Sequence, residues 1–280
     1  MSLLDFILNL AALLLWLNWR AVELSAATRP SVLSLASALK RAEPKPVNRW
    51  SYLIGLSALL IVRALFYWQA GPPLNWTPFI HLGTIALPFH SEAFSRMFLF
   101  SFSGFLVTIG FFYLALILLS VVNRKVLDTD PLQRIVRLQL GAMARLPGVV
   151  RIAVAFLVVT FLWLLLNRPL VSLGLSAPPV SSSVLCQQSI AIGLGIFLSW
   201  KYVIVVLLIA YSLNSYVYLG SSLIWNYVNM TGRNLLAPLR WLPLGIGKAD
   251  FAPVVGIALV LVIAHYLGSG LTTLYKHPPF

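Results

Sequence analysis

The sequence predicts an all-α protein that crosses a membrane about six times. Of its 280 residues, 60% are hydrophobic and only 10% are charged, and the mean hydropathy is +0.90. A soluble globular domain carries far more charge and far less apolar surface. Six apolar runs are long enough to span most of a bilayer, and most of the basic residues lie in three of the connections between them.

The first predicted span, 3–19, has the apolar stretch of a signal peptide but not its charge pattern. Asp5 stands where a signal peptide carries basic residues, and Arg20 follows the run instead of preceding it. We therefore expect an uncleaved helix. The remaining spans, each bordered by Trp, Tyr, Arg or Pro, are expected at 50–69, 96–122, 149–167, 189–218 and 251–271.

The distribution of charge predicts the orientation of these spans. The connections after spans one, three and five hold six, six and three of the 20 Lys and Arg residues. By the positive-inside rule these connections are cytoplasmic, and both termini are predicted to be periplasmic. The net charge of +13 therefore flanks apolar spans, which favours anionic phospholipids as partners and argues against direct binding of nucleic acid.

Two of the outer connections resemble each other. Residues 78–95 and 169–186 align without a gap and share Pro, Leu, Gly, Ala, Pro and Ser at equivalent positions, and Gly104 and Gly195 keep the same spacing. This similarity predicts that one helix–loop–helix unit was copied three times. The predicted units are a degenerate first helix pair and two further pairs, each preceded by an outer loop, at 1–70, 71–168 and 169–280.

The middle inner connection has the pattern of an amphipathic helix. Asp130 can cap a helix that begins at Pro131. We expect one face to carry Leu132, Ile135, Val136, Leu140, Met143 and Leu146, and the other Gln133, Arg134, Arg137 and Arg145. Such a helix lies in the membrane plane with its basic face against the headgroups. The alternative is a packed helical linker, and weaker versions of the pattern occur in the other two inner connections.

The third inner connection carries a motif. Residues 231–243 follow the pattern T-x-R-x-L-L-x-P-L-R-x-L-P, and 250–253 read D-F-A-P before the last apolar run. Over residues 231–266 the sequence resembles the YggT (YlmG) family of small bacterial, cyanobacterial and plastid membrane proteins. The resemblance implies a multi-pass protein of the bacterial cytoplasmic (inner) membrane. It also implies a role in membrane or nucleoid organisation, in cell or plastid division, or, in plastids, in cofactor maturation of the cytochrome b–f complex.

We expect the basic residues of this motif, in a proline-punctuated loop, to bind a lipid or a partner. Arg233 and Arg240 lie seven residues apart, so on a helix they share a face and can hold phosphates or carboxylates bidentately. Asp250 can cap the last span and pair with one of them. The predicted lipid- or partner-binding residues are Arg233, Arg240, Pro238, Pro243, Lys248, Asp250, Arg134 and Arg137.

Three ionisable residues fall inside predicted spans: Arg63, Lys201 and His265. A basic residue at the bilayer centre costs roughly 2.5–3.5 kcal/mol on insertion scales, so it usually faces a helix bundle, a cavity or a partner. No Asp or Glu lies deep in a span, and Asp5 and Glu92 are assigned to the outer boundary. We therefore expect Arg63 to extend toward the outer surface, or to meet an anionic guest or an acid from another subunit. Lys201 is expected to face the bundle or a subunit interface.

Catalytic patterns are not found in the sequence. It holds no paired intramembrane carboxylates, no Ser-His-Asp elbow and no H-E-x-x-H, and its only cysteine is Cys186. We expect no catalytic residue, no metal and no cofactor, although His81 and His90 leave haem or pigment binding open.

The favoured hypothesis is a non-enzymatic scaffold, assembly factor or subunit of a membrane complex. Its partners would be other integral membrane proteins, and its basic cytoplasmic face would bind anionic lipid or an acidic partner. The repeats and intramembrane cations keep two alternatives open, a small-solute or ion transporter or channel and a haem- or cofactor-handling protein.

Overall fold

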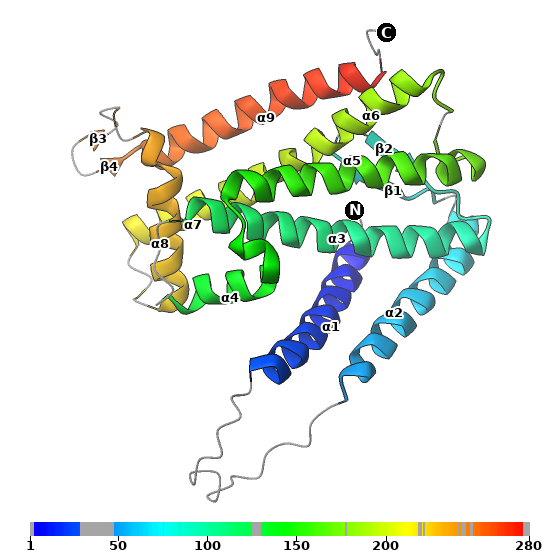
Figure 1. The fold of residues 1–280 in the computed structure, drawn as a ribbon, viewed down its shortest axis with the longest axis horizontal. Coiled ribbons are helices and arrows are strands. Elements are labelled where there is room, and N and C mark those ends of the chain that lie inside the picture. The colour runs from blue at the N-terminus through cyan, green and yellow to red at the C-terminus, as the bar shows by residue number, and fades with distance from the viewer. Residues whose placement is uncertain are drawn as a thin grey trace, which may run out of the picture. The chain divides into compact units, whose positions relative to one another are not determined.

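Most of the chain is described by the computed structural model, shown in Figure 1. The described residues are 3–28, 48–124, 130–217 and 220–276, apart from 75, 84, 177, 221, 240, 242–244, 247 and 248. Of the inner connection after the first span, residues 29–47 lie outside them, and so does the amphipathic pattern that the sequence predicts there.

Among the described residues, six helical segments are long and apolar enough to cross a membrane. They are α1 (Leu3–Thr28), α2 (Arg49–Ala70), α3 (Phe94–Val122), α5 (Gly148–Ser172), the pair α6 (Ser182–Gly195) and α7 (Trp200–Tyr216), and α9 (Ala252–Lys276). A 3₁₀ turn, η4 (Ile196–Ser199), joins α6 to α7, so Ser182–Tyr216 counts as one span of 35 residues. The prediction of an all-α, multi-pass membrane protein is confirmed.

Shorter elements connect the spans. The helices are α4 (Pro131–Leu140) and α8 (Leu223–Leu235), and the 3₁₀ turns are η2 (Pro72–Leu74), η3 (Gly141–Arg145) and η5 (Ala237–Leu239). Two small sheets were not predicted: β1 (Phe79–Leu82) with β2 (Ile85–Pro88), and β3 (Gly245–Ile246) with β4 (Ala249–Asp250), which is antiparallel. Runs of two to four residues are too short to give a clear alternating pattern.

The chain divides into two compact units. Unit 1 comprises Met1–Ile80 and Pro88–Ile109, and unit 2 comprises His81–Leu87 and Gly110–Phe280. In unit 1, α1 packs against α2, and the buried core consists of Ala12, Leu56, Leu60 and Phe105. In unit 2, α5 packs on α6, α9 packs on both α6 and α7, and α7 packs on α8.

Glycines allow the helices of unit 2 to approach closely. A Cβ atom on Gly193 of α6 would lie 2.2 Å from the Thr160 hydroxyl of α5, and one on Gly256 of α9 would lie 2.9 Å from Leu236. Small residues at such contacts are typical of membrane helices, which associate through close van der Waals packing. Between α5 and α6 the backbone separation therefore depends on Gly193.

The two outer segments that define the predicted repeat differ in backbone conformation. Residues 79–82 form a strand, whereas the aligned residues 170–172 continue helix α5. The aligned glycines share a feature, since Gly83 has φ 65° and Gly174 has φ 71°. A Cβ on Gly83 would also lie 2.5 Å from the carbonyl oxygen of Gly195. The threefold repeat, with boundaries at 70 and 168, stays a prediction.

Two details of the inner connections correct the sequence interpretation. Helix α4 has the predicted cap, with the Asp130 side chain accepting from the backbone N–H groups of Leu132 and Gln133, but it ends at Leu140 because Gly141 has φ 55°. The amphipathic face therefore does not continue as an α-helix to Leu146. The second correction concerns the motif, whose residues 231–235 belong to helix α8 and not to a loop.

Candidate functional site

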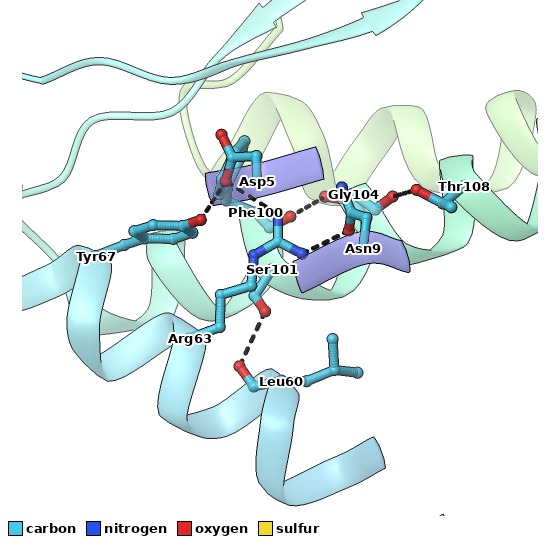
Figure 2. A network of polar contacts seen from close by, with 10 residues as sticks. Asp5, Asn9, Leu60, Arg63, Tyr67, Phe100, Ser101, Gly104 and Thr108 are labelled. Atoms are coloured by element: carbon cyan, nitrogen blue, oxygen red, sulfur yellow. Dashed lines mark hydrogen bonds and ion pairs between the residues drawn. The ribbon is translucent and has the colours of Figure 1, made fainter. Parts of the chain in front are cut away.

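A buried ionic cluster joins the first two spans. One turn apart on α2 lie Arg63 and Tyr67, and one turn apart on α1 lie Asp5 and Asn9. The Arg63 Nη1 donates to Asn9 Oδ1 at 2.6 Å, and Nη2 lies 3.3 Å from Asp5 Oδ1. The Tyr67 hydroxyl donates to the same Asp5 oxygen, as Figure 2 shows. Asp5 is 3% exposed and Arg63 is 2% exposed, so this is a desolvated ion pair.

Helix α3 closes this cluster from a third side. The Arg63 guanidinium carbon lies 5.6 Å from the ring centroid of Phe100 and 5.5 Å from that of Tyr67. A Cβ on Gly104 would lie 3.4 Å from Arg63 Nη2, so the absence of a side chain there leaves room for the guanidinium. The Ser101 hydroxyl donates to the Leu60 carbonyl at 2.9 Å, which fixes α3 to α2 beside the ion pair.

The structure corrects the expectation for Arg63. Its side chain neither extends to the outer surface nor requires an acid from another subunit, because Asp5 neutralises it within unit 1. The sequence signal was the pairing of polar residues four apart on each helix, Asp5 with Asn9 and Arg63 with Tyr67. Arg63 thus joins helices, while two buried donors, Arg63 Nε and Asn9 Nδ2, find no partner among the residues placed by the structure.

A second buried network lies in unit 2 and joins α3, α4 and α8. The Asn123 side chain donates to the Thr231 hydroxyl at 2.8 Å and accepts from the Asn234 amide at 2.9 Å. The Tyr227 hydroxyl donates to Gln133 Oε1 at 3.0 Å. Burial raises the pKa of the Tyr227 phenol above its ordinary value. The first residue of the YggT-like motif, Thr231, is therefore a packed structural residue.

Gln133 shows what the sequence pattern missed. The amphipathic pattern assigned it to the basic face of this helix, against the headgroups, but it is fully buried against α8 through Tyr227. On the apolar face, Val136 and Leu140 are buried and pack with Leu116 and Ile117 of α3, while Ile135 is 52% exposed. Helix α4 is thus rotated so that Gln133 joins the packed side.

Four exposed arginines lie on the elements that this network joins or directly after them. They are Arg124 after α3, Arg134 on α4, Arg145 in η3 and Arg233 in the last turn of α8, and we call them the basic end of unit 2. Two further arginines are less exposed. Arg137 of α4 is half-buried, and Arg151 donates to the carbonyls of Leu146 and Ala144 at 2.8 and 2.9 Å, which secures the turn after α4.

The rest of the predicted motif set is only partly described. Pro238 is exposed in η5, whereas Arg240, Pro243 and Lys248 lie outside the described residues. Asp250 has its backbone in β4, paired with Gly245, and its side chain lies outside them as well. Because α8 ends at Leu235, Arg233 and Arg240 do not share one continuous α-helix, and that expectation is wrong.

Lys201 lies in the wall of an apolar groove in unit 2. The groove has a volume of about 410 Å³ and runs between the α6–η4–α7 span and α9, where Leu194, Leu198, Ile263 and Leu267 contribute to its walls. The Lys201 ammonium lies 5.0 Å from the ring centroid of Tyr202. Within the described ranges it makes no hydrogen bond or ion pair.

His265 does not share the environment of the other intramembrane basic residues. It is exposed on α9, with its ring 5.7 Å from that of Tyr266.

Comparison of the chain with protein-family models, with curated proteins and with solved structures finds no match. The resemblance to the YggT family therefore rests on the motif alone.

Proposed function

We propose that this protein is a non-enzymatic scaffold, assembly factor or subunit of a membrane complex in the bacterial cytoplasmic membrane. The observation that carries the proposal is the basic end of unit 2, where four exposed arginines lie on, or directly after, three helices that buried hydrogen bonds join. We infer that this end faces the cytoplasm and binds anionic lipid or an acidic partner, as expected from the charge distribution.

Because their backbones are held in place, these arginines can contribute directed hydrogen bonds to a ligand as well as electrostatic attraction. Each basic side chain near an anionic surface contributes on the order of 1 kcal/mol. A guanidinium also binds a phosphate or carboxylate through two parallel hydrogen bonds, which a lysine does not. The Asn123–Thr231 bond holds α8 to the end of α3, and the Tyr227–Gln133 bond holds α4 to α8. Arg233 on α8 and Arg134 on α4 therefore lose little conformational freedom of their backbones when a ligand binds.

The test is purification of the tagged full-length protein from its native membrane in mild detergent, with quantification of the chains and lipids that accompany it. We expect a stoichiometric membrane-protein partner, and we expect Arg134→Gln with Arg233→Gln to reduce its retention. The matched control is Arg168→Gln with Lys276→Gln. These two exposed basic residues lie near the C-terminal ends of α5 and α9 and do not belong to the basic end of unit 2.

A second variant separates geometry from charge. Asn123→Ala keeps every arginine but removes the side chain that joins α3 to α8, and we expect it to weaken retention of the partner as well. If the protein purifies alone and shows solute-dependent thermal shifts, the transporter alternative replaces the proposal. Equal retention by the glutamine pair and its control would exclude the basic end as the binding surface.

A further inference from the structure

Lys201 is far from both ends of its span. It is preceded by Ser182–Trp200 and followed by Tyr202–Tyr216 within one helical segment. At about 1.5 Å per residue, these lengths place it roughly 28 Å from one end and 22 Å from the other. The opposite wall of the groove is formed by the stretch from Val260 to Leu271, in the middle and second half of α9. Lys201 therefore lies near the middle of its own span and faces the middle and second half of α9, as expected for an ammonium deep in the membrane.

A charge at this depth needs a counter-charge. Its flexible stem is far shorter than half of a ~30 Å hydrocarbon core, so extension to a headgroup does not solve the problem. The ring face of Tyr202, with its centroid 5.0 Å away, stabilises the cation only in part. Other side chains that line the groove with Lys201 are apolar or, in Trp200, donate elsewhere, since Trp200 Nε1 donates to the Leu114 carbonyl at 3.0 Å.

Within the described part of the chain, no acid supplies this counter-charge. Asp5 is bound to Arg63 near the start of α1. Glu92 and Asp130 precede α3 and α4, and Glu23 follows the apolar stretch Leu3–Val22 of α1. The complete set is Asp5, Glu23, Glu43, Glu92, Asp128, Asp130 and Asp250. A second copy of the chain carries the same acids, so its described acids do not lie in the middle of a span opposite Lys201 either. Phospholipid headgroups lie at the membrane surface, about half the core thickness away.

The groove is open to a neighbouring helix. Leu194 on one wall is 43% exposed, and Ile263 and Leu267 on the other wall are 49% and 56% exposed. On the same helix, a Cβ on Gly270 would meet no atom within 4 Å, so nothing crowds the α9 backbone there. The groove has apolar walls and one cation near the middle of the span. An apolar helix that carries one carboxylate near its middle is complementary to it in both hydrophobicity and charge.

We propose that this groove receives a transmembrane helix of a different integral membrane protein, and that an Asp or Glu in the middle of that helix pairs with Lys201. This inference rests on the proposed function, because it gives the chemistry of one partner in the complex. The carboxylate neutralises the ammonium, while the exposed leucines and isoleucine pack against the apolar side chains of the partner helix.

The experiment uses the full-length protein in its native membrane. A photoreactive residue replaces Leu267 in the groove wall or, as a matched control, Val262, which is 54% exposed on α9 but does not line the groove. Each photoreactive variant is made with Lys201 unchanged, with Lys201→Met and with Lys201→Arg. The readouts are the crosslinked peptide, the amount of partner that co-purifies, and the thermal stability of each variant in detergent.

We expect crosslinking from position 267 and not from position 262, to a transmembrane segment that contains an Asp or Glu. Lys201→Met should lower crosslinking and co-purification at least about tenfold, since it removes one partner of a desolvated pair, without lowering thermal stability. Lys201→Arg should retain the partner. Replacing the partner's acid by its amide should match Lys201→Met, and exchanging the two charges should restore binding.

Three results would overturn the inference: a crosslinked segment without an acid, full retention of the partner by Lys201→Met, or a bound phospholipid that Lys201→Met releases from the groove. These differ from failure of the proposed function, in which the unmodified protein has no stoichiometric partner at all. A complex that survives Lys201→Met but is lost with Arg134→Gln and Arg233→Gln would leave the proposed function standing without this contact.

Discussion

Asp5→Asn is the most direct test of the buried cluster in unit 1. The substitution keeps the shape of the side chain but leaves the Arg63 guanidinium, only 2% exposed, beside neutral groups. Two contacts to Asp5 weaken, those from Arg63 Nη2 and from the Tyr67 hydroxyl. Polar contacts between membrane helices contribute about 0.6–1.7 kcal/mol each. An uncompensated charge raises the total toward the roughly 3–5 kcal/mol measured for broken buried pairs in soluble proteins.

We therefore expect Asp5→Asn to lower the free energy of unfolding by about 3 kcal/mol, measured by reversible denaturant titration in lipid bicelles. The double variant Asp5→Leu with Arg63→Leu removes both charges, and we expect it to be more stable than Asp5→Asn. The control is Glu92→Gln, an exposed acid that should change stability by no more than about 0.5 kcal/mol. An Asp5→Asn effect as small as that of Glu92→Gln, or a double leucine variant less stable than Asp5→Asn, would refute the assignment of this pair.

The remaining predictions address packing, protonation and topology. Gly193→Ala should destabilise the protein by about 1–3 kcal/mol, because its Cβ would overlap the Thr160 hydroxyl, whereas Gly110→Ala, with no atom within 4 Å, should be neutral or slightly stabilising in a thermal melt. The raised pKa of Tyr227 predicts stability that is complete below pH ~10 and is lost as the pH rises through the higher pKa of the folded state; Tyr227→Phe should flatten that loss in melts at alkaline pH. A phosphatase or fluorescent-protein fusion at the C-terminus should report the periplasm and one at Gly141 the cytoplasm, and the reverse at either position would contradict the proposed topology.

Local signals in the sequence were sufficient for the spans and for one helix cap. Hydropathy depends only on neighbouring residues, and all six expected spans coincide with long apolar helices. Asp130 and Pro131 act within a single turn, and the structure places both as expected at the start of α4. The end of α4 at Gly141 was missed because apolar residues continue with helical spacing beyond the glycine.

Contacts between segments far apart in the chain could not be predicted from such local signals. The partner of Arg63 is 58 residues away on another helix. From the local sequence, Asp5 is assigned to the outer boundary of the membrane. Gln133 is polar, so its burial depends on Tyr227, a residue 94 positions later. In both cases the environment of a polar group is decided by tertiary packing, which a periodic pattern on one helix does not contain.

The ion pair between α1 and α2 has a consequence for biogenesis. Helix α1 leaves the ribosome before Arg63 has been synthesised, so Asp5 first meets the membrane without its counter-ion. An unpaired charge opposes partitioning into lipid, while the paired hairpin presents none. We therefore expect stable insertion of the first span to await translation of the second, with the two helices entering the bilayer as one hairpin. A nascent chain truncated before α2 should remain extractable by alkali, whereas one that extends past Tyr67 should not.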